Sequence, residues 1–157
     1  MSAQHIFDHA PLGSIIAYSD RAQRPPDRFV NKLKAWKNNN GTGGLIRKAR
    51  AFQRGSWSSP ASITLHHGNH SSGGIVVMTF QTEHSVTSDL EFTILRRPEA
   101  GSVLVLQPWG HGVELLHVAA DRTSAETWRR DNRHSDAVLE EVPSEAASNV
   151  PDLGRVA

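Results

Sequence analysis

Residues 75–95, IVVMTFQTEHSVTSDLEFTIL, contain two consecutive stretches with the composition of β-strands. Residues 75–82 begin with apolar side chains on both sides, which is typical of a strand in the middle of a sheet. Residues 85–95 alternate between apolar and polar side chains, which predicts a strand with one buried face. The side chains predicted to face the core are Val86, Leu90, Phe92 and Ile94.

Further strand-like stretches lie on both sides, separated by short segments rich in glycine, proline and serine. Short connections between neighbouring strands favour antiparallel pairing. Residues 45–54 have no clean apolar face, and their lysines and arginines are typical of an edge strand. The predicted loops are 55–61, 68–74, 96–102 and 108–112. The remaining predicted strands are 12–19, 62–67, 103–107, 113–119 and 137–142.

Residues 25–38 are predicted to form a helix. Its two prolines suit a first helical turn, and Phe29, Leu33 and Trp36 recur at the spacing of one helix face. Aromatic residues at that spacing usually belong to a core. The NNNG sequence that follows is typical of a helix C-terminus, so residues 41–44 are expected to form a loop.

A second helix is predicted near the C-terminal end. Thr123 and Glu126 match a capping box, in which the first side chain accepts from free backbone amides and the second reaches back. The helix is expected to end near Asp131, with Ala125 and Trp128 on its buried face.

Together these elements predict an α+β fold: one twisted, mostly antiparallel sheet of about six to seven strands with two helices on one face. The chain has 157 residues, of which 38% are hydrophobic, and this length suits one domain. That domain is predicted to cover residues 1–142. Residues 143–157 lack any periodicity and are predicted to form a disordered tail that is dispensable for folding.

The charge distribution is uneven. Residues 21–57 carry ten lysines and arginines against one aspartate, a net charge of +9, although the whole chain is only +1. Such a segment is typical of a surface that binds a polyanion. Aromatic residues interleave with the cations, and aromatic rings can stack on unpaired bases.

The sequence therefore favours a small, non-enzymatic binding or regulatory module that contacts nucleic acid through residues 21–57. The alternative to a binding surface is neutralisation of these cations by acidic segments elsewhere in the fold. The predicted contact residues are Arg28, Lys32, Lys34, Lys37, Arg47, Lys48, Arg50, Phe52, Arg54 and Trp57.

Two other functions stay open. The same basic surface could bind an acidic protein partner, as an accessory protein or inhibitor does. A metal-independent nuclease could instead use a pair of histidines as general acid and base. The candidate histidines are His66, His67, His84, His111 and His117, with Lys48 or Arg50 to hold a phosphate.

The sequence matches no cofactor motif. The loop at residues 41–44 lacks the Gly-Lys-Ser/Thr of a P-loop, and Ile46 breaks the glycine pattern of a dinucleotide site. No cofactor is therefore expected. Trp109, which lies between proline and glycine in a predicted hairpin loop, is a candidate contact for a protein partner or a cover for the end of the sheet.

Most catalytic and metal-binding patterns are missing. The chain has no cysteine, which excludes disulfides, cysteine-ligated zinc and a thiol nucleophile. His66 and His67 are adjacent on a predicted strand and so point to opposite faces, which argues against a shared metal ion. We therefore expect no metal site and assign no catalytic residue.

The longest apolar run is far shorter than the ~18 residues that span a bilayer. The N-terminal residues have neither the basic nor the apolar region of a secretory signal. The sequence therefore predicts a cytoplasmic protein that has no membrane partner.

Overall fold

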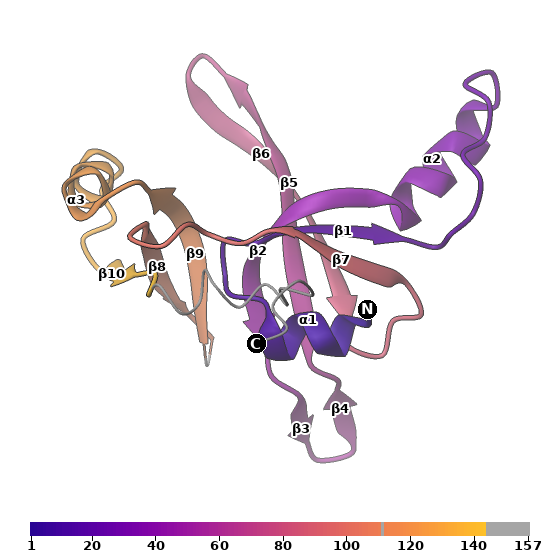
Figure 1. The fold of residues 1–157 in the computed structure, drawn as a ribbon, viewed down its shortest axis with the longest axis horizontal. Helices are drawn as coiled ribbons and strands as arrows, with labels where there is room; N and C mark the ends of the chain where they lie inside the picture. Colours follow the sequence, from indigo (N-terminus) through magenta and orange to yellow (C-terminus); the bar gives the residue numbers. More distant parts are fainter. Residues whose placement is uncertain (111, 144–157) are drawn as a thin grey trace, which may run out of the picture.

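A curled antiparallel sheet forms the centre of the molecule, and two hairpins and a helix project from it (Figure 1). The computed structural model describes residues 1–110 and 112–143. The helices are α1 (Ala3–His9), α2 (Val30–Asn39) and α3 (Arg122–Asp131). The strands are β1 (Ile15–Ser19), β2 (Gly41–Ala49), β3 (Phe52–Arg54), β4 (Trp57–Ser59), β5 (Ser62–Ser72), β6 (Ile75–Ser85), β7 (Glu91–Arg96), β8 (Val103–Trp109), β9 (Gly112–Ala119) and β10 (Val138–Glu141).

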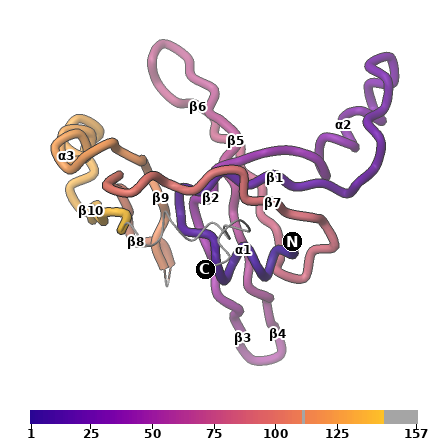
Figure 2. The backbone as a smooth tube through the Cα atoms, viewed as in Figure 1, coloured from indigo at the N-terminus to yellow at the C-terminus, as the bar shows by residue number. Residues whose placement is uncertain are grey.

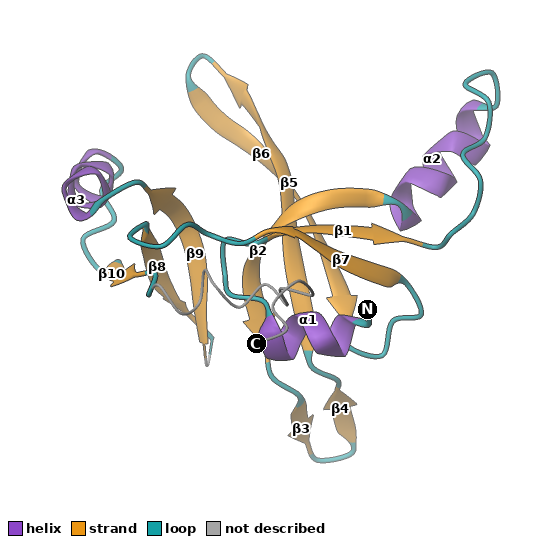
Figure 3. Cartoon of the chain, in the orientation of Figure 1, coloured by secondary structure: helices purple, strands orange, loops and turns teal. Residues whose placement is uncertain are grey.

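The predicted α+β class with a mostly antiparallel sheet is confirmed (Figure 3). Six strands follow the order β10-β8-β9-β2-β1-β7, and β5 joins β2 with β6 beside it, which makes eight strands in this sheet. Strands β3 and β4 form a separate two-stranded hairpin. The structure has a third helix, α1, that the sequence patterns did not indicate.

Strand β2 joins the parts of the sheet, because it pairs with β1, β5 and β9. Its first residues are the glycines expected to form a loop, and that expectation was wrong. A Cβ on Gly41 would lie 2.7 Å from the Tyr18 hydroxyl, and one on Gly43 would lie 2.9 Å from the Leu65 Cβ. Neighbouring side chains can therefore pack directly over this part of the strand only because it lacks side chains.

The main core lies between α1 and the strands β1, β2, β5 and β7. Ile6 of α1 is fully buried there with Leu45 and Phe92. A second cluster packs α3 onto β8 through Val105 and Ala125. The opposite face of β8 contributes to a third cluster, so β8 is buried on both sides as expected for residues 103–107.

Several strand predictions need correction. Residues 45–54 were expected to form one edge strand, but β2 ends at Ala49 and pairs with β1, β5 and β9, and β3 begins at Phe52. Residues 75–82 were expected in the middle of the sheet, but β6 pairs only with β5 among the described strands and is exposed over most of its length. Residues 68–74 were expected to form a loop, but β5 continues to Ser72 and only Gly73 and Gly74 turn the chain. A run with apolar residues on both sides has the same period whether both sides are buried or both are exposed.

The strand predicted at 85–95 begins later than expected. Residues 86–90 form a connection in which the Ser85 hydroxyl accepts from the Thr87 N–H at 3.1 Å. Side chains of this type compete with the backbone pairing of a strand. The part that becomes β7 pairs with β1 rather than with β6, and Phe92 is buried as predicted.

The helix predicted at 25–38 starts later, at Val30, and it does not lie on the sheet. α2 has no buried residue and projects from the rest of the chain, as the backbone tube also shows (Figure 2). Trp36 of its apolar stripe contacts the loop that leads into the helix instead. Trp36 is half-buried, and its Nε1–H donates to the Ala22 carbonyl at 2.8 Å. Phe29 and Trp36 are therefore not core residues.

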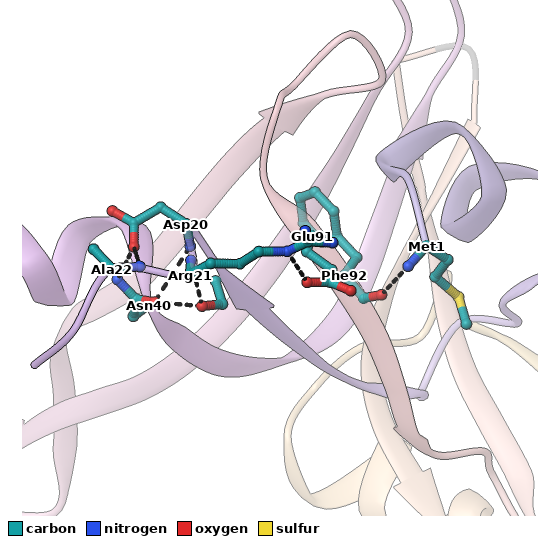
Figure 4. Close-up of polar contacts among 8 residues, drawn as sticks. Met1, Asp20, Arg21, Ala22, Asn40, Glu91 and Phe92 are labelled. Atoms are coloured by element: carbon teal, nitrogen blue, oxygen red, sulfur yellow. Dashed lines mark hydrogen bonds and ion pairs between the residues drawn. The ribbon is translucent and has the colours of Figure 1, made fainter.

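Polar contacts close the base of this projection (Figure 4). The Asn40 amide donates to the Asp20 carboxylate at 2.9 Å, which joins the two ends of the segment that contains α2. Hydrogen bonds from Asn40 and from the Ala22 N–H hold the pKa of Asp20 below its ordinary value. The Arg21 guanidinium donates to Glu91 of β7 at 2.6 Å and so attaches the base to the sheet.

The second predicted helix is confirmed as α3, with Ala125 buried and Trp128 half-buried. Its cap is Asp121 rather than Thr123, because the Asp121 carboxylate accepts from the Ser124 N–H at 2.7 Å. Residues 144–157 of the predicted tail lie outside the described residues, so its dispensability stays a prediction. None of the helices in the described ranges has the length and apolar character needed to cross a bilayer.

Candidate functional site

The basic segment 21–57 does not form a single surface. Its residues follow α2, then β2 across the sheet, and then the β3–β4 hairpin, which projects from a different side of the molecule (Figure 1). The predicted contact residues therefore fall into two groups. One group is on or next to α2: Arg28, Lys32, Lys34 and Lys37. The other begins in the second half of β2: Arg47, Lys48, Arg50, Phe52, Arg54 and Trp57.

The helix group is exposed to solvent. Arg28 and Lys32 lie over the Phe29 ring, with the guanidinium carbon 4.7 Å and the ammonium nitrogen 5.1 Å from its centroid. All four cations of this group are exposed, and so is Phe29. This group therefore adds positive charge to a projecting helix but has no concave surface among the described cavities.

Three residues of the second group, Lys48, Arg50 and Phe52, line a groove of about 550 Å³, which we call the Lys48 groove. One wall is the chain from Lys48 to Phe52, at the end of β2 and the start of β3. Another is the β8–β9 hairpin, through Trp109 and Val113. Phe7 of α1 and Leu12 complete the apolar lining. The fold thus brings together three segments that are far apart in the sequence.

A cation of β2 lies over the ring of Trp109, which is the last residue of β8. The Arg47 guanidinium carbon lies 4.2 Å from the centroid of the Trp109 ring, and the same guanidinium donates to Gln81 at 3.0 Å. Glu114 pairs with Arg47 in the strand register. Arg47 therefore orients the indole, and its predicted contact with nucleic acid stays a prediction.

Lys48 differs in its surroundings from the exposed cations of the helix group. It is half-buried, and this burial lowers the pKa of its ammonium group. Attraction by Asp8 and repulsion by Arg97 act in opposite directions and are smaller. A titratable group with a shifted pKa in a cleft is a candidate for a functional residue. An anion in the groove would lie next to a positive charge that is poorly solvated.

The β3–β4 hairpin extends the groove with aromatic and basic side chains. Phe52 and Trp57 are diagonal neighbours across the hairpin, and their ring centroids are 5.5 Å apart in an edge-to-face arrangement. Phe52 is 39% exposed and Trp57 62% exposed. Arg50 and Arg54 are also exposed, so cations and aromatic rings alternate along this edge.

The histidines considered for catalysis lie in two separate places. His67 Nδ1–H donates to the Thr42 carbonyl at 2.9 Å, and its Nε2 is 2.7 Å from the Thr82 hydroxyl, which is 3.1 Å from His84 Nε2. Burial and the nearby His67 lower the pKa of His84. These bonds satisfy the rings within the fold, and neither ring lines the Lys48 groove.

His66 and His117 line a second cavity, of about 460 Å³, together with Arg96 and Arg97. Burial lowers the pKa of His117, whose ring stacks on Trp128 at a centroid distance of 4.9 Å. The predicted partners Lys48 and Arg50 lie at the other cavity. His111 falls outside the described residues. No group of three or more potential metal ligands gathers within residues 1–110 and 112–143.

The model of one protein family, described as Uncharacterised conserved protein UCP036055, matches residues 1–146. The chain belongs to this family. No curated protein and no solved structure matches the chain. The span shared with the UCP036055 family includes both cavities and both projecting hairpins. The family description specifies no activity, so the functional argument depends on the chemistry of the groove.

The sequence indicated only part of this site. Lys48, Arg50 and Phe52 are close together in the chain and were predicted as contact residues. Phe7, Leu12 and Val113 were not, because nothing in their local sequence relates them to the basic segment. Trp109 was noted as a candidate contact for a protein partner or a cover for the end of the sheet, but only the β2–β9 pairing brings its hairpin to Lys48.

Proposed function

We propose that the Lys48 groove binds single-stranded nucleic acid. The observation that supports this proposal is the proximity of apolar and aromatic walls to cations: Trp109 and Phe52 line the groove together with Lys48 and Arg50. Proteins that bind single strands combine stacking rings with cations that follow the phosphates. In this arrangement an unpaired base contacts Trp109 or Phe52, and a neighbouring phosphate contacts Lys48.

The size of the groove favours a single strand over a duplex. Cavities of about 300–1,000 Å³ hold small ligands, and a volume of about 550 Å³ therefore suits one or two nucleotides. A duplex hides the faces of its bases, so the exposed rings of Phe52 and Trp57 would have nothing to stack on. Arg50 and Arg54 continue the positive charge beyond the groove for the following phosphates.

The cations on α2 have a different role in this proposal. They lie on a separate projection and do not line the groove. Exposed positive charge attracts a polyanion over a distance and accelerates its association. We therefore expect the helix group to affect the salt dependence of binding more than the selection of single strands.

The test is a binding titration with fluorescently labelled oligonucleotides, followed by anisotropy. A homopolymer of deoxythymidine or uridine is compared with a duplex of equal length across a range of salt concentrations. We expect tighter binding of the single strand and a steep loss of affinity as salt rises, because bound cations release counterions from the phosphates. Equal or tighter binding of the duplex contradicts the proposal, as does the absence of salt dependence.

A matched pair of variants locates the binding site. Arg50→Ala and Lys34→Ala each remove one exposed cation, the first at the groove and the second on α2. We expect Arg50→Ala to weaken binding of the single strand more. If no oligonucleotide binds, and nuclease-treated protein still captures an acidic protein in a manner that requires Arg50, the partner is a protein.

The second cavity supports one other candidate function, cleavage of RNA. We infer it from the presence of His66 and His117 beside Arg96 and Arg97. One imidazole would take the proton of the 2′-hydroxyl as its oxygen attacks phosphorus, and the other would protonate the departing 5′-oxygen. The lowered pKa of His117 favours its neutral form, which suits the base.

RNA cleavage has a direct assay. Labelled RNA incubated with the protein and a chelator should yield 2′,3′-cyclic phosphate ends, whereas DNA of the same sequence should stay intact. His66→Ala and His117→Ala should each remove the activity, and His70→Ala serves as a matched control because His70 lies outside the cavity. Intact RNA, or cleavage that the chelator abolishes, contradicts this candidate.

A further inference from the structure

The outer part of the β5–β6 hairpin, residues 67–80, exposes more apolar side chain than any other described element. We call it the β-arm; it projects from the sheet with solvent around it (Figure 1). The large apolar side chains of β6 have exposed fractions from 51% for Phe80 to 70% for Ile75. Contiguous apolar surface of this kind indicates an interaction site. The large apolar residues involved are Ile75, Val76, Val77, Met78 and Phe80.

The β-arm also has an unpaired edge. Among the described strands β6 pairs with β5 alone, so its outer backbone N–H and C=O groups have no strand partner. Edge strands in single-chain proteins are normally protected by lysine, proline, bulges or short length. β6 has eleven residues, and its residues 75–82 contain no charged residue and no proline. Its edge is therefore suited to pairing with another strand.

The two strands of the β-arm differ in how well their free edges could pair with another strand. The outer part of β5 is polar, and it has an extra residue, His67, where its register with β6 shifts between His66 and Gly68. At the second shift the extra residue is on β6, where Val77 lies between the paired residues Val76 and Met78. Bulges of this kind disrupt further pairing. β6 combines β-branched composition with an uncharged free edge that has no extra residue from Met78 to Thr82, so a partner strand would add there.

We propose that β6 pairs with β6 of a second copy of this chain, antiparallel about a two-fold axis, to form a dimer with one continuous sheet. Such an axis places each residue of the segment opposite a residue of the same segment. Because residues 75–82 are uncharged, this arrangement brings no like charges together. The strand is thus complementary to itself, which would not hold for an edge with lysines.

The area involved agrees with a reversible dimer. Side chains alternate along the regular part of β6, so Met78 and Thr79 project to opposite faces and both faces take part in the contact. Five such side chains offer on the order of 500 Å² per copy, somewhat below the ~800 Å² per partner of standard interfaces. Main-chain hydrogen bonds along the edge add to this contact. We therefore expect a dimer that dissociates on dilution.

Sedimentation velocity over a dilution series of the full chain tests the dimer. The wild type should sediment as a dimer at high concentration and as a monomer when dilute. Val77→Lys should remain monomeric throughout, because lysines would then lie close to each other across the axis. Val138→Lys is the matched control, since Val138 is 59% exposed and Val77 58%, and both lie on edge strands.

The sedimentation results either support or overturn the proposed dimer. A dimer that Val77→Lys abolishes and Val138→Lys preserves supports the proposal. A wild-type chain that stays monomeric at every concentration overturns it, and so does an equal effect of the two variants. Circular dichroism confirms that the variants fold, which both exposed positions allow.

Single-cysteine cross-linking tests the strand arrangement. Because the chain has no cysteine of its own, Val76→Cys, Val77→Cys, Met78→Cys, Thr79→Cys and Phe80→Cys each introduce one thiol. Under mild oxidation the disulfide yield should peak at the position nearest the axis and fall on both sides. Uniform yields or no cross-linking would overturn the antiparallel pairing. The Lys48 groove contains no residue of the β-arm, so neither result affects the nucleic-acid proposal.

Discussion

Helices α1 and α2 are both short, but only α1 is part of the core. α1 has seven residues, buries Ala3 and Ile6, and is capped by Ser2, whose hydroxyl accepts from the His5 N–H. α2 has ten residues, buries none and is preceded by Phe29, which makes no side-chain capping bond. Yet α2 has the clearer apolar stripe in the sequence. A helical period therefore indicates that a helix forms but does not identify the surface on which it packs.

The same contrast applies to the cations. Those on α2 are surrounded by water, whereas Lys48 is half-buried beside α1 and lines a groove with Phe7. Charge density along the chain is similar in the two groups, but their surroundings are not. The difference suggests that burial and aromatic neighbours, more than the number of lysines, locate a binding site.

The largest effect is expected from shortening a side chain of α1. Ile6→Ala should lower the free energy of unfolding by about 2–5 kcal/mol, because Ile6 is fully buried in the main core. Leu33→Ala on α2 is the matched control and should lower it by less than about 1 kcal/mol. Urea unfolding measures both values. Comparable losses in the two variants would show that α2 contributes to the core.

The next largest effect concerns the groove. Trp109→Ala should weaken binding of a single strand by about 1–3 kcal/mol, the contribution of one stacked base. Trp36→Ala removes the same ring type from α2 and should change affinity little. Anisotropy titrations at one salt concentration give both dissociation constants. A larger loss from Trp36→Ala would place the binding surface on the helix.

A smaller effect is expected from pH. Because burial lowers the pKa of Lys48, its ammonium group should lose its proton at a lower pH than an ordinary lysine. The charged form attracts phosphate, so affinity should be highest below the lowered pKa and should fall as pH rises through it. Lys48→Arg keeps its charge in this range and should bind with a flatter pH profile. Identical profiles for the two proteins would exclude a contribution from Lys48.

The smallest effect is expected at the helix caps, because α3 has a side-chain cap and α2 has none. Asp121→Ala should lower the thermal midpoint by a few degrees at neutral pH, because the α3 amides lose their acceptor. Hydrogen bonds from Ser124 lower the folded-state pKa of Asp121 below 3.8. The stability that this carboxylate adds is therefore present above pH 3.8 and is lost as pH falls through the folded-state pKa.

Two further variants complete this comparison. Asp121→Asn still caps the helix but cannot ionise, so its midpoint should not show that loss at low pH. Phe29→Ser gives α2 a capping hydroxyl and should raise helix content by circular dichroism with little change in the midpoint. An unchanged midpoint for Asp121→Ala at neutral pH would contradict the assigned role of the cap.

Local sequence patterns predicted several of the elements well. The buried run that became β8, its hairpin partner β9 and helix α3 were predicted close to their actual bounds. α1 was missed, although Ala3, Ile6 and Ala10 have the spacing of one helix face, because the short segment is otherwise polar. β6 was placed in the interior because an apolar run does not reveal what surrounds it.

The site was only partly predictable for a different reason. Residues 48–52 could be recognised from their composition, but the residues opposite them come from α1 and from the β8–β9 hairpin. Which segments meet is decided by the pairing of β2 with β1, β5 and β9. Those pairings depend on long-range register and on the close packing over Gly41 and Gly43, and no local period encodes them.

The contact between β2 and β9 has a consequence for how the molecule moves. Their register contains a single residue pair, Arg47 with Glu114, whereas every other strand pair in the sheet is aligned over at least four. Each side of this seam has an apolar cluster of its own, and a third cluster crosses the seam where Ile46 of β2 packs against residues of β8 and β9. We expect the two sides to open as separate units in hydrogen exchange, with the third cluster as the main apolar contact that holds them together. The Lys48 groove has walls from both sides, so a bound strand would bridge the seam and restrain that opening.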